Sequence, residues 1–408
     1  MNTFIKPKHV IEVICLLLLP VSFAMAQQTV ADSALLERIN VLEKQNLDRR
    51  PGEDNFLVAG LATFGFVSNN TTTTFNGIKE KTMTNSWDGD HYEFSPLFLW
   101  RHGKKFLMEF EPSFADGTLG VNWADVTYFA APGLMVRAGY FELPFGVYNR
   151  RLAAGWINKL ATDPIGVPDM PPTTDYGLEL GGGFQAGTMK WNYAVAISNG
   201  NQLLPDGSIQ GAGISDNNRK KTFSGRVGWL PLSNSSVEIG ASYMGGKVGD
   251  AGSEYENVKA SFYAMDLNVV ENIRPFQLNI KGQYNWGNIG SAKFINPDNQ
   301  TETYTFENKT QTGFIQAALR PMFAANNIVK NFEIAGRYGN FTTPKNSLWG
   351  AKSTAYTVGL NYWMTWRTVL RITYEGINGT NTSSKDLGAP NGAITKSNSL
   401  YLQFAIQL

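Results

Sequence analysis

The chain ends on the segment Asn398-Ser399-Leu400-Tyr401-Leu402-Gln403-Phe404-Ala405-Ile406-Gln407-Leu408, which alternates between two kinds of side chain. Leucine, phenylalanine or isoleucine holds every even position from 400 to 408, and the odd positions are mostly polar or small. Successive side chains of a β-strand point to opposite faces. The segment is therefore expected to be a strand with one apolar face and one wet face.

About sixteen such runs follow one another from Asn55 onward, separated by Gly, Asn, Pro and Ser. Each covers about nine to twelve residues, the length that a tilted strand needs to cross a membrane, whereas strands of a soluble sandwich are nearer five or six. They are expected near 55–67, 91–101, 105–114, 119–130, 133–141, 175–186, 188–198, 222–231, 236–245, 257–270, 273–286, 309–321, 330–340, 353–364, 366–376 and 398–408.

The connections between these runs alternate in length. If the first strand runs outward, the outer connections are 68–90, 115–118, 142–174, 199–221, 246–256, 287–308, 341–352 and 377–397, and only 115–118 and 246–256 are not clearly long. The inner ones are as short as 102–104, 131–132, 187 and 365. Short inner turns and long outer loops are typical of outer-membrane barrels. The sequence predicts an all-β fold, a 16-stranded antiparallel transmembrane β-barrel over 53–408, in which the last strand closes against the first. Barrels of this size leave an aqueous channel.

The first 26 residues predict a cleaved secretory signal. Lys6 and Lys8 precede an apolar run from Val10 to Phe23, and Ala24-Met25-Ala26 offers a cleavage site. A membrane-spanning helix is the alternative, but the run is shorter than the roughly 20 residues required and contains a glutamate. The only cysteine, Cys15, lies in this segment, so disulfides are not expected in the mature chain.

Residues 27–52 are expected to form a periplasmic segment with a short helix at 34–45. Leu35, Leu36, Ile39 and Leu42 fall at helical spacing there. The helix is too short to be stable alone in water, so it is either a frayed amphipathic helix or a short oligomeric coiled coil.

The connection 142–174 is the candidate constriction loop. It is roughly 30 residues long without clear apolar periodicity, and such connections usually bind or cover something. It carries Arg150, Arg151 and Lys159 beside Trp156. These cations are either solvated loop charges or, together with Arg137 on the preceding strand, an anion-attracting constriction whose width Trp156 helps to define.

The segment Val136-Arg137-Ala138-Gly139-Tyr140-Phe141-Glu142-Leu143-Pro144-Phe145-Gly146 resembles the phosphate-selective porin O and P family of Gram-negative outer membranes. Residues 175–180, 191–196, 332–338 and 357–362 are also similar to strands of that family, and the resemblance covers most of 55–408. It implies a homotrimer of sixteen-stranded barrels in outer-membrane lipid that passes small anions such as phosphate along arginines and lysines.

The charges expected to face the lumen depart from that family. The alternation places the cations Arg137, Arg226, Lys281, Arg320, Arg337 and Arg371 inside, together with the carboxylates Glu109, Glu111, Asp125, Glu179, Glu238, Asp266, Glu333 and Glu375. A phosphate path favours cationic donors without neighbouring carboxylates. The residues therefore predict a porin more firmly than they predict selectivity for phosphate. Selectivity is expected to come from the width of the pore and from the electric field of these mixed charges.

Enzymatic chemistry is not predicted, and neither is a metal site or a cofactor. Glu109 and Glu111 lie on one strand face and do not flank a substrate as a glycosidase pair does. His91 and His102 belong to opposite ends of one strand, which disfavours a metal site or a catalytic triad. Gly181-Gly182-Gly183 falls inside a strand, where it thins or bends the wall, rather than in a phosphate-cradling loop.

Nine of the ten tryptophans are considered for the interfacial aromatic girdles, because most of them lie near strand ends, where such girdles belong; they are Trp100, Trp123, Trp156, Trp191, Trp229, Trp286, Trp349, Trp363 and Trp366. Sugar-stacking platforms are the alternative.

The formal net charge of +1 does not indicate a nucleic-acid partner. The expected function is passive entry of small hydrophilic solutes through the outer membrane; the alternatives are a surface or secreted β protein that holds glycans, and a barrel enzyme with a catalytic cluster at one rim.

Overall fold

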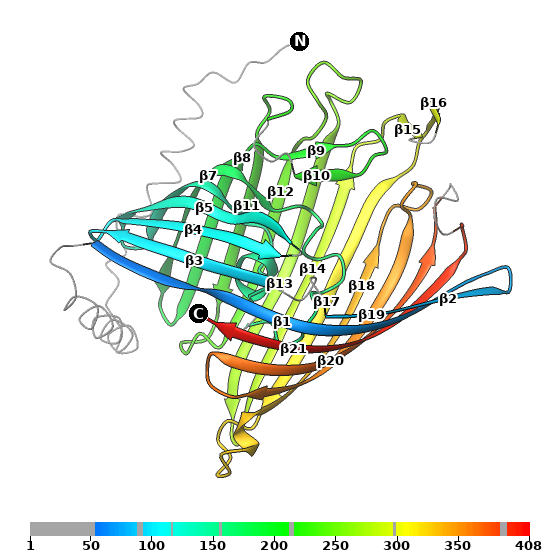
Figure 1. Ribbon diagram of the computed structural model, residues 1–408. Helices are drawn as coiled ribbons and strands as arrows, with labels where there is room; N and C mark the ends of the chain where they lie inside the picture. Colours follow the sequence, from blue (N-terminus) through cyan, green and yellow to red (C-terminus); the bar gives the residue numbers. More distant parts are fainter. Residues whose placement is uncertain are drawn as a thin grey trace, which may run out of the picture.

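The computed structural model describes residues 54–87, 93–115, 117–154, 157–211, 216–296, 299–383 and 390–408. Within these ranges the chain is almost entirely β-structure (Figure 1). The expected signal sequence 1–26, the segment 27–52 with its helix 34–45, Trp156 and His91 lie outside the described residues. None of the described helices is long and apolar enough to cross a membrane.

The strands form the antiparallel 16-stranded barrel that the alternation predicts, so the fold class is confirmed. Each strand of the wall pairs with the next along the chain. The wall strands are β1 (Asp54–Phe75), β3 (Glu93–His102), β4 (Phe106–Ala115), β5 (Thr118–Ala131), β6 (Leu134–Glu142), β7 (Thr174–Ala186), β8 (Met189–Ser198), β11 (Thr222–Leu230), β12 (Val237–Lys247), β13 (Lys259–Ile273), β14 (Phe276–Ile289), β17 (Asn308–Arg320), β18 (Phe332–Thr342), β19 (Ala351–Trp363), β20 (Thr368–Asn381) and β21 (Ile394–Gln407).

The barrel closes between its first and last strands. β1 pairs with β21 from Leu61↔Gln407 to Thr74↔Ile394, and the Leu408 N–H donates to the Gly60 carbonyl at 3.0 Å. On its other edge the N-terminal part of β1 pairs with β3, from Asp54↔His102 to Thr63↔Glu93. Every wall strand therefore has two neighbours, which removes the free sheet edges that would otherwise promote aggregation.

The expected outer connection 68–90 is wrong in one respect, because most of it is a β-hairpin. β1 continues to Phe75 and turns through Asn76 and Gly77, both at positive φ, into β2 (Ile78–Trp87). Asn-Gly is the preferred two-residue hairpin turn. This part of β1 is rich in threonine, and both of its faces are polar, so the alternation that marks the other strands is lost although the β-branched side chains still favour a strand.

The long connections gather at one end of the barrel, here called the long-loop rim. It carries 143–173, 199–221, 248–258, 290–307, 343–350 and 382–393, with the short strands β9 (Asn201–Leu203), β10 (Ile209–Gly211), β15 (Phe294–Asn296) and β16 (Asn299–Tyr304). The opposite rim has brief turns, and its longest connection, 321–331, ends in the 3-10 helix η4 (Val329–Asn331).

Burial in the wall is the reverse of that in a soluble protein. Large apolar side chains such as Ile334 (66 % exposed) and Val358 (56 %) point outward, whereas the polar Thr357 and Asn361, on the other face of β19, are buried. The barrel thus presents an apolar surface outside and a polar one inside, as membrane barrels do. Thr357 and Asn361 face the interior and yet have almost no contact with solvent, so protein fills part of the interior.

Candidate functional site

The interior is partly filled by the connection 143–173, here called the inward loop. Its ends meet where the Leu143 N–H donates to the Thr173 carbonyl at 2.8 Å. The expected limits 142–174 are wrong by one residue at each end, because Glu142 closes β6 and Thr174 opens β7. Glu142 accepts hydrogen bonds from the Thr173 and Thr174 hydroxyls, each at 2.6 Å, and these fix the base of the loop.

The first part of the inward loop is held by uncharged wall residues. The Gly146 N–H donates to Ser242 Oγ of β12 at 3.0 Å, and the Val147 and Tyr148 N–H groups donate to Gln283 Oε1 of β14 at 2.8 and 2.9 Å. Gly146 has φ +65°, and a Cβ there would lie 2.2 Å from the Gln283 amide nitrogen. Only glycine suits both the backbone conformation and the close approach.

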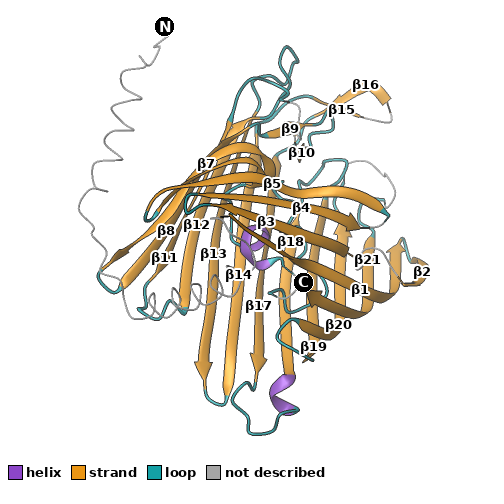
Figure 2. Cartoon of the chain, turned by 60° about the vertical axis from the view of Figure 1, so that its left-hand side comes forward, coloured by secondary structure: helices purple, strands orange, loops and turns teal. Residues whose placement is uncertain are grey.

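An apolar contact then anchors the short π-helix η3 (Tyr148–Leu152), which lies inside the ring of strands in Figure 2. Val147, Tyr148, Leu152 and Val167 form one buried cluster with Phe314 of β17, and the Tyr148 and Phe314 rings meet edge to face at 5.4 Å. Phe314 is an inward apolar side chain on a largely polar face. It gives the loop a hydrophobic base against the wall.

Inward side chains of β14, β18 and β19 donate hydrogen bonds to the backbone carbonyl oxygens of the second part of the loop. Arg337 donates to the Thr162 carbonyl and hydroxyl, both at 2.6 Å, and to the Asp163 carbonyl at 2.9 Å. Asn361 donates to the Lys159 carbonyl at 2.8 Å, and Lys281 donates to the Ile157 carbonyl. Arg337 and Lys281, both expected to face the lumen, therefore serve here as buried anchors.

The three loop cations among the anion attractors expected from the sequence are each bound to a wall carboxylate. Arg150 pairs with Glu179 of β7, Arg151 with Glu238 of β12 at 2.6 Å, and Lys159 Nζ with Glu333 of β18 at 3.3 Å. Burial lowers the pKa of Lys159, and the Glu333 carboxylate opposes that shift. These pairs hold the loop across the barrel and neutralise most of its positive charge.

Two cations of the wall, Arg137 and Arg226, are paired with carboxylates in the same way. Arg137 donates to both oxygens of Asp125, at 2.7 and 2.5 Å, and to Glu109 at 3.1 Å. Arg226 forms ion pairs with Asp266 at 2.5 Å and with Glu238 at 3.0 Å. Arg371 donates to Gln403 at 2.9 Å.

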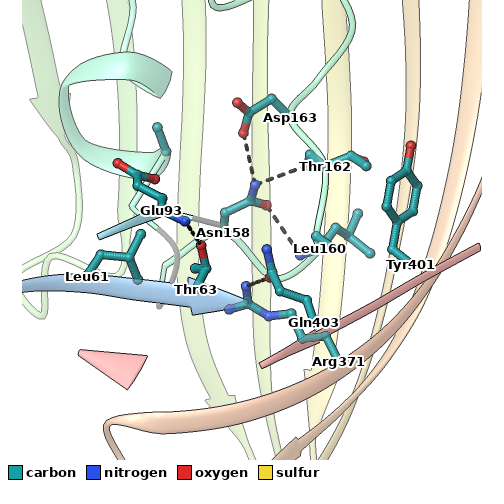
Figure 3. Close-up of a pocket in the computed structure, with 12 residues that line it drawn as sticks. Leu61, Thr63, Glu93, Asn158, Leu160, Thr162, Asp163, Arg371, Tyr401 and Gln403 are labelled. Carbon is teal, nitrogen blue, oxygen red and sulfur yellow. Dashed lines mark hydrogen bonds between the residues drawn. The ribbon is translucent and has the colours of Figure 1, made fainter. Parts of the chain in front are cut away.

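A passage remains between the inward loop and the wall formed by β1, β3 to β6, β20 and β21. It consists of three adjoining cavities of about 340, 520 and 410 Å³, all of which contact Ala153 and Asp163 of the loop. Figure 3 shows the first cavity, where Asn158, Leu160 and Asp163 of the loop face wall residues that include Arg371 and Gln403. The loop narrows the barrel without filling it.

Carboxylates line this passage more richly than cations do. They are Glu93, Glu109, Glu111, Glu142, Asp163 and Asp169, against Arg137, Arg150, Arg151 and Arg371. Among the described residues only Glu109 of these carboxylates forms an ion pair. Glu93, Glu111, Glu142 and Asp163 accept hydrogen bonds from uncharged donors, as Asp163 does from the Tyr148 hydroxyl at 2.6 Å. Such bonds satisfy the oxygens but leave the negative charge uncompensated.

Two tryptophans expected in the interfacial girdles lie inside the barrel instead. Trp123 donates to Glu111 at 2.6 Å and lines the passage, and Trp363, 4 % exposed, donates to Glu333 at 2.7 Å. For Trp123 the cause is an irregularity in the β4–β5 pairing. Glu111 pairs with Trp123 but Pro112 pairs with Val121, so the extra residue Asn122 reverses the alternation.

The passage residues that the sequence reasoning missed are Glu93, Glu142, Asp163 and Asp169. Asp163 and Asp169 lie in the loop, which has no alternation that could assign them a direction, and Glu93 and Glu142 lie at the first and last positions of their strands. Burial, followed by the charge of Asp163, raises the pKa of Asp169.

Among the described residues, no group of three or more His, Cys, Asp or Glu side chains could hold a metal ion.

Solved structures with a similar fold are outer-membrane proteins. The outer membrane channel DcaP of Acinetobacter baumannii superposes with a TM-score of 0.52 at 10 % identity, over 87 % of this chain and 97 % of that one. OmpT, an outer membrane protein of Vibrio cholerae, gives 0.51 at 10 % identity, over 88 % and 99 %. No protein-family model and no curated protein sequence matches the chain. At these identities the likeness concerns the fold alone: the chain shares the barrel architecture of these proteins.

Proposed function

We propose that the protein is an outer-membrane porin, a passive diffusion channel for small hydrophilic solutes. The observation that carries the proposal is the series of three cavities left between the inward loop and the wall, inside a barrel whose outer surface is apolar. A loop fixed by ion pairs and buried hydrogen bonds sets the width of that passage. Location in a Gram-negative outer membrane and assembly as a homotrimer follow from the family resemblance and belong to the same proposal.

There are two candidate ion preferences, one for anions and one for cations. An anion or phosphate preference is what the resemblance implies, and Arg151, whose side chain is 43 % exposed, and Arg371 both contact the passage. The pairing of Arg150, Arg151 and Lys159 weighs against it. The uncompensated Glu93, Glu111 and Asp163 support a mild cation preference, because fixed charges along a pore attract counter-ions. We favour the cation preference.

Planar-bilayer recording in a potassium chloride gradient tests the proposal. The purified protein should insert as stable open channels whose reversal potential favours potassium. Glu93→Gln with Glu111→Gln should move that potential toward chloride, while Glu80→Gln on the exposed hairpin strand β2 serves as the matched control and should not. Absence of conductance from folded, inserted protein would overturn the channel, and a chloride preference that Arg150→Gln with Arg151→Gln removes would restore the anion pathway.

A non-channel barrel that binds glycans is the alternative. The stacked Trp191 and Trp229 rings, with centroids 6.0 Å apart, are the aromatic pair that such a function would use. They lie on neighbouring strands near the short-turn rim. Liposome swelling with graded sugars separates the two functions, since only a channel admits small sugars faster than large ones.

A further inference from the structure

A basic hollow lies at the long-loop rim, away from the passage. Its volume is about 480 Å³, and Arg219, Lys220, Lys221, Lys247 and Lys259 line it together with Tyr243. The cations come from the end of the connection 199–221, the end of β12 and the start of β13. The topology therefore gathers cations from separate parts of the chain at one point of the rim.

The hollow faces the outside of the barrel. Lys247 pairs with Lys259, Gly245 with Ser261, and Tyr243 with Tyr263, so both lysines share a face with the two tyrosines. Those rings lie 5.2 Å apart and are 37 % and 52 % exposed on the apolar outer surface. Aromatic residues of this kind mark the membrane–water interface of a barrel. The lysines thus stand directly above the aromatic level.

The positive charge of the hollow is only partly compensated. Like charges directly opposite each other on paired strands are destabilising, and Lys247 and Lys259 are such a pair. Among the described residues, Lys221 forms an ion pair with Asp216 at 2.6 Å, while Lys247 donates to the uncharged Asn257 at 2.7 Å. The arrangement is suited to a bound anion.

Small residues give such an anion room. Gly245, Gly246 and Ser261 line the hollow between the lysines and the tyrosines. A Cβ at Gly245 would lie 2.2 Å from the Tyr243 hydroxyl, so that hydroxyl is turned toward the rim, where it can donate beside the ammonium groups. Larger residues at these positions would close the hollow.

We infer that this basic hollow binds the phosphate group of a lipid in the outer leaflet of the membrane. Lysine and arginine are the residues that bind phosphate, and basic clusters beside a membrane-spanning segment recognise phosphorylated headgroups. The outward direction and the position just above Tyr243 and Tyr263 favour a lipid over free phosphate, because acyl chains can then lie along the apolar wall. The inference requires the barrel to be in a membrane, but it does not require the barrel to conduct.

Lipid retention by the full-length protein in neutral detergent tests the inference. The protein is incubated with lipid A, with dephosphorylated lipid A or with inorganic phosphate, and bound ligand is measured by native mass spectrometry. The change is Lys247→Gln with Lys259→Gln. The matched control is Lys79→Gln with Lys81→Gln, which removes the same charge from the exposed strand β2. Heat-modified gel mobility verifies folding of every variant.

The expected result is that lipid A binds, that its dephosphorylated form binds less, and that the Lys247/Lys259 variant loses about fivefold in affinity per lysine while the control is unchanged. Equal binding by both variants would overturn the inference. Binding of inorganic phosphate as tight as that of lipid A would mean a free-phosphate site and would also overturn it. Conductance recorded on the same variants should be unaltered, so failure of this inference is distinguishable from failure of the channel proposal.

Discussion

Arg151 of the inward loop and Glu238 of β12 meet through two hydrogen bonds, from Nη1 to Oε2 at 3.0 Å and from Nη2 to Oε1 at 2.6 Å. Glu238 also accepts from Arg226, so one wall carboxylate holds both a loop cation and a wall cation. The loop is therefore fastened to the wall by charge.

A double-mutant cycle with Arg151→Gln and Glu238→Gln should reveal a coupling energy of about 0.5 to 1 kcal/mol, kept small because the Arg151 side chain is 43 % exposed. The coupling energy is measured by unfolding in denaturant, with loss of the heat-modifiable gel mobility of the folded barrel as the readout. Strictly additive effects would contradict an anchoring role for the pair.

Arg337→Gln should lower the stability of the protein more than a substitution of an exposed residue does. It removes the donors to Thr162 and Asp163 and leaves Glu375 without its buried cation, and breaking a buried pair costs about 3 to 5 kcal/mol. The freed loop should also produce noisier and wider channels in single-channel recording. Arg367→Gln, which removes the same charge from a turn of the opposite rim, is the control. Unchanged noise in Arg337→Gln would mean that the loop is held elsewhere.

Gly146→Ala should destabilise the loop by about 1 to 3 kcal/mol, because a left-handed backbone and a collision with Gln283 coincide at that position. Gly187→Ala is the matched control, since Gly187 also has positive φ (+63°) but nothing lies within 4 Å of its Cβ position. Protease sensitivity of the loop in the folded barrel measures the difference. Equal protease sensitivity of the loop in the two variants would contradict the role given to Gly146, because Gly187 lies in the turn between β7 and β8 and not in the loop.

Acidification should weaken the cation preference. The carboxylates of the passage lose their charge as they bind protons, and Asp169, whose pKa is raised by burial and by the charge of Asp163, should do so above the ordinary range near pH 4. Asp169→Asn should therefore remove the earliest part of the change when reversal potentials are recorded from neutral to acidic pH. The control is Asp216→Asn, at a carboxyl outside the passage whose pKa is lowered by Lys221. A preference independent of pH would contradict the role given to the carboxylates.

The sequence by itself determined the barrel, because lipid outside and water inside impose a two-residue period that can be read along each strand without knowledge of its neighbours. Leu400, Leu402 and Phe404 on one face of β21, with Gln403 on the other, suffice to orient that strand. Loop length also marked the inward connection between β6 and β7. Where the period is interrupted, at Asn122, the residues before and after the interruption need opposite assignments: Leu119 and Val121 lie outward, but Trp123 lies inward with Asp125.

Only the tertiary structure decided what the charges do. Whether Arg150, Arg151 and Lys159 face the passage freely or are neutralised depends on contacts with Glu179, Glu238 and Glu333, which lie between 29 and 174 positions away along the chain. The loop has no repeating pattern that fixes its path. Its path follows from packing on Phe314 and from hydrogen bonds to inward side chains of several strands, and those partners come together only when the barrel has closed.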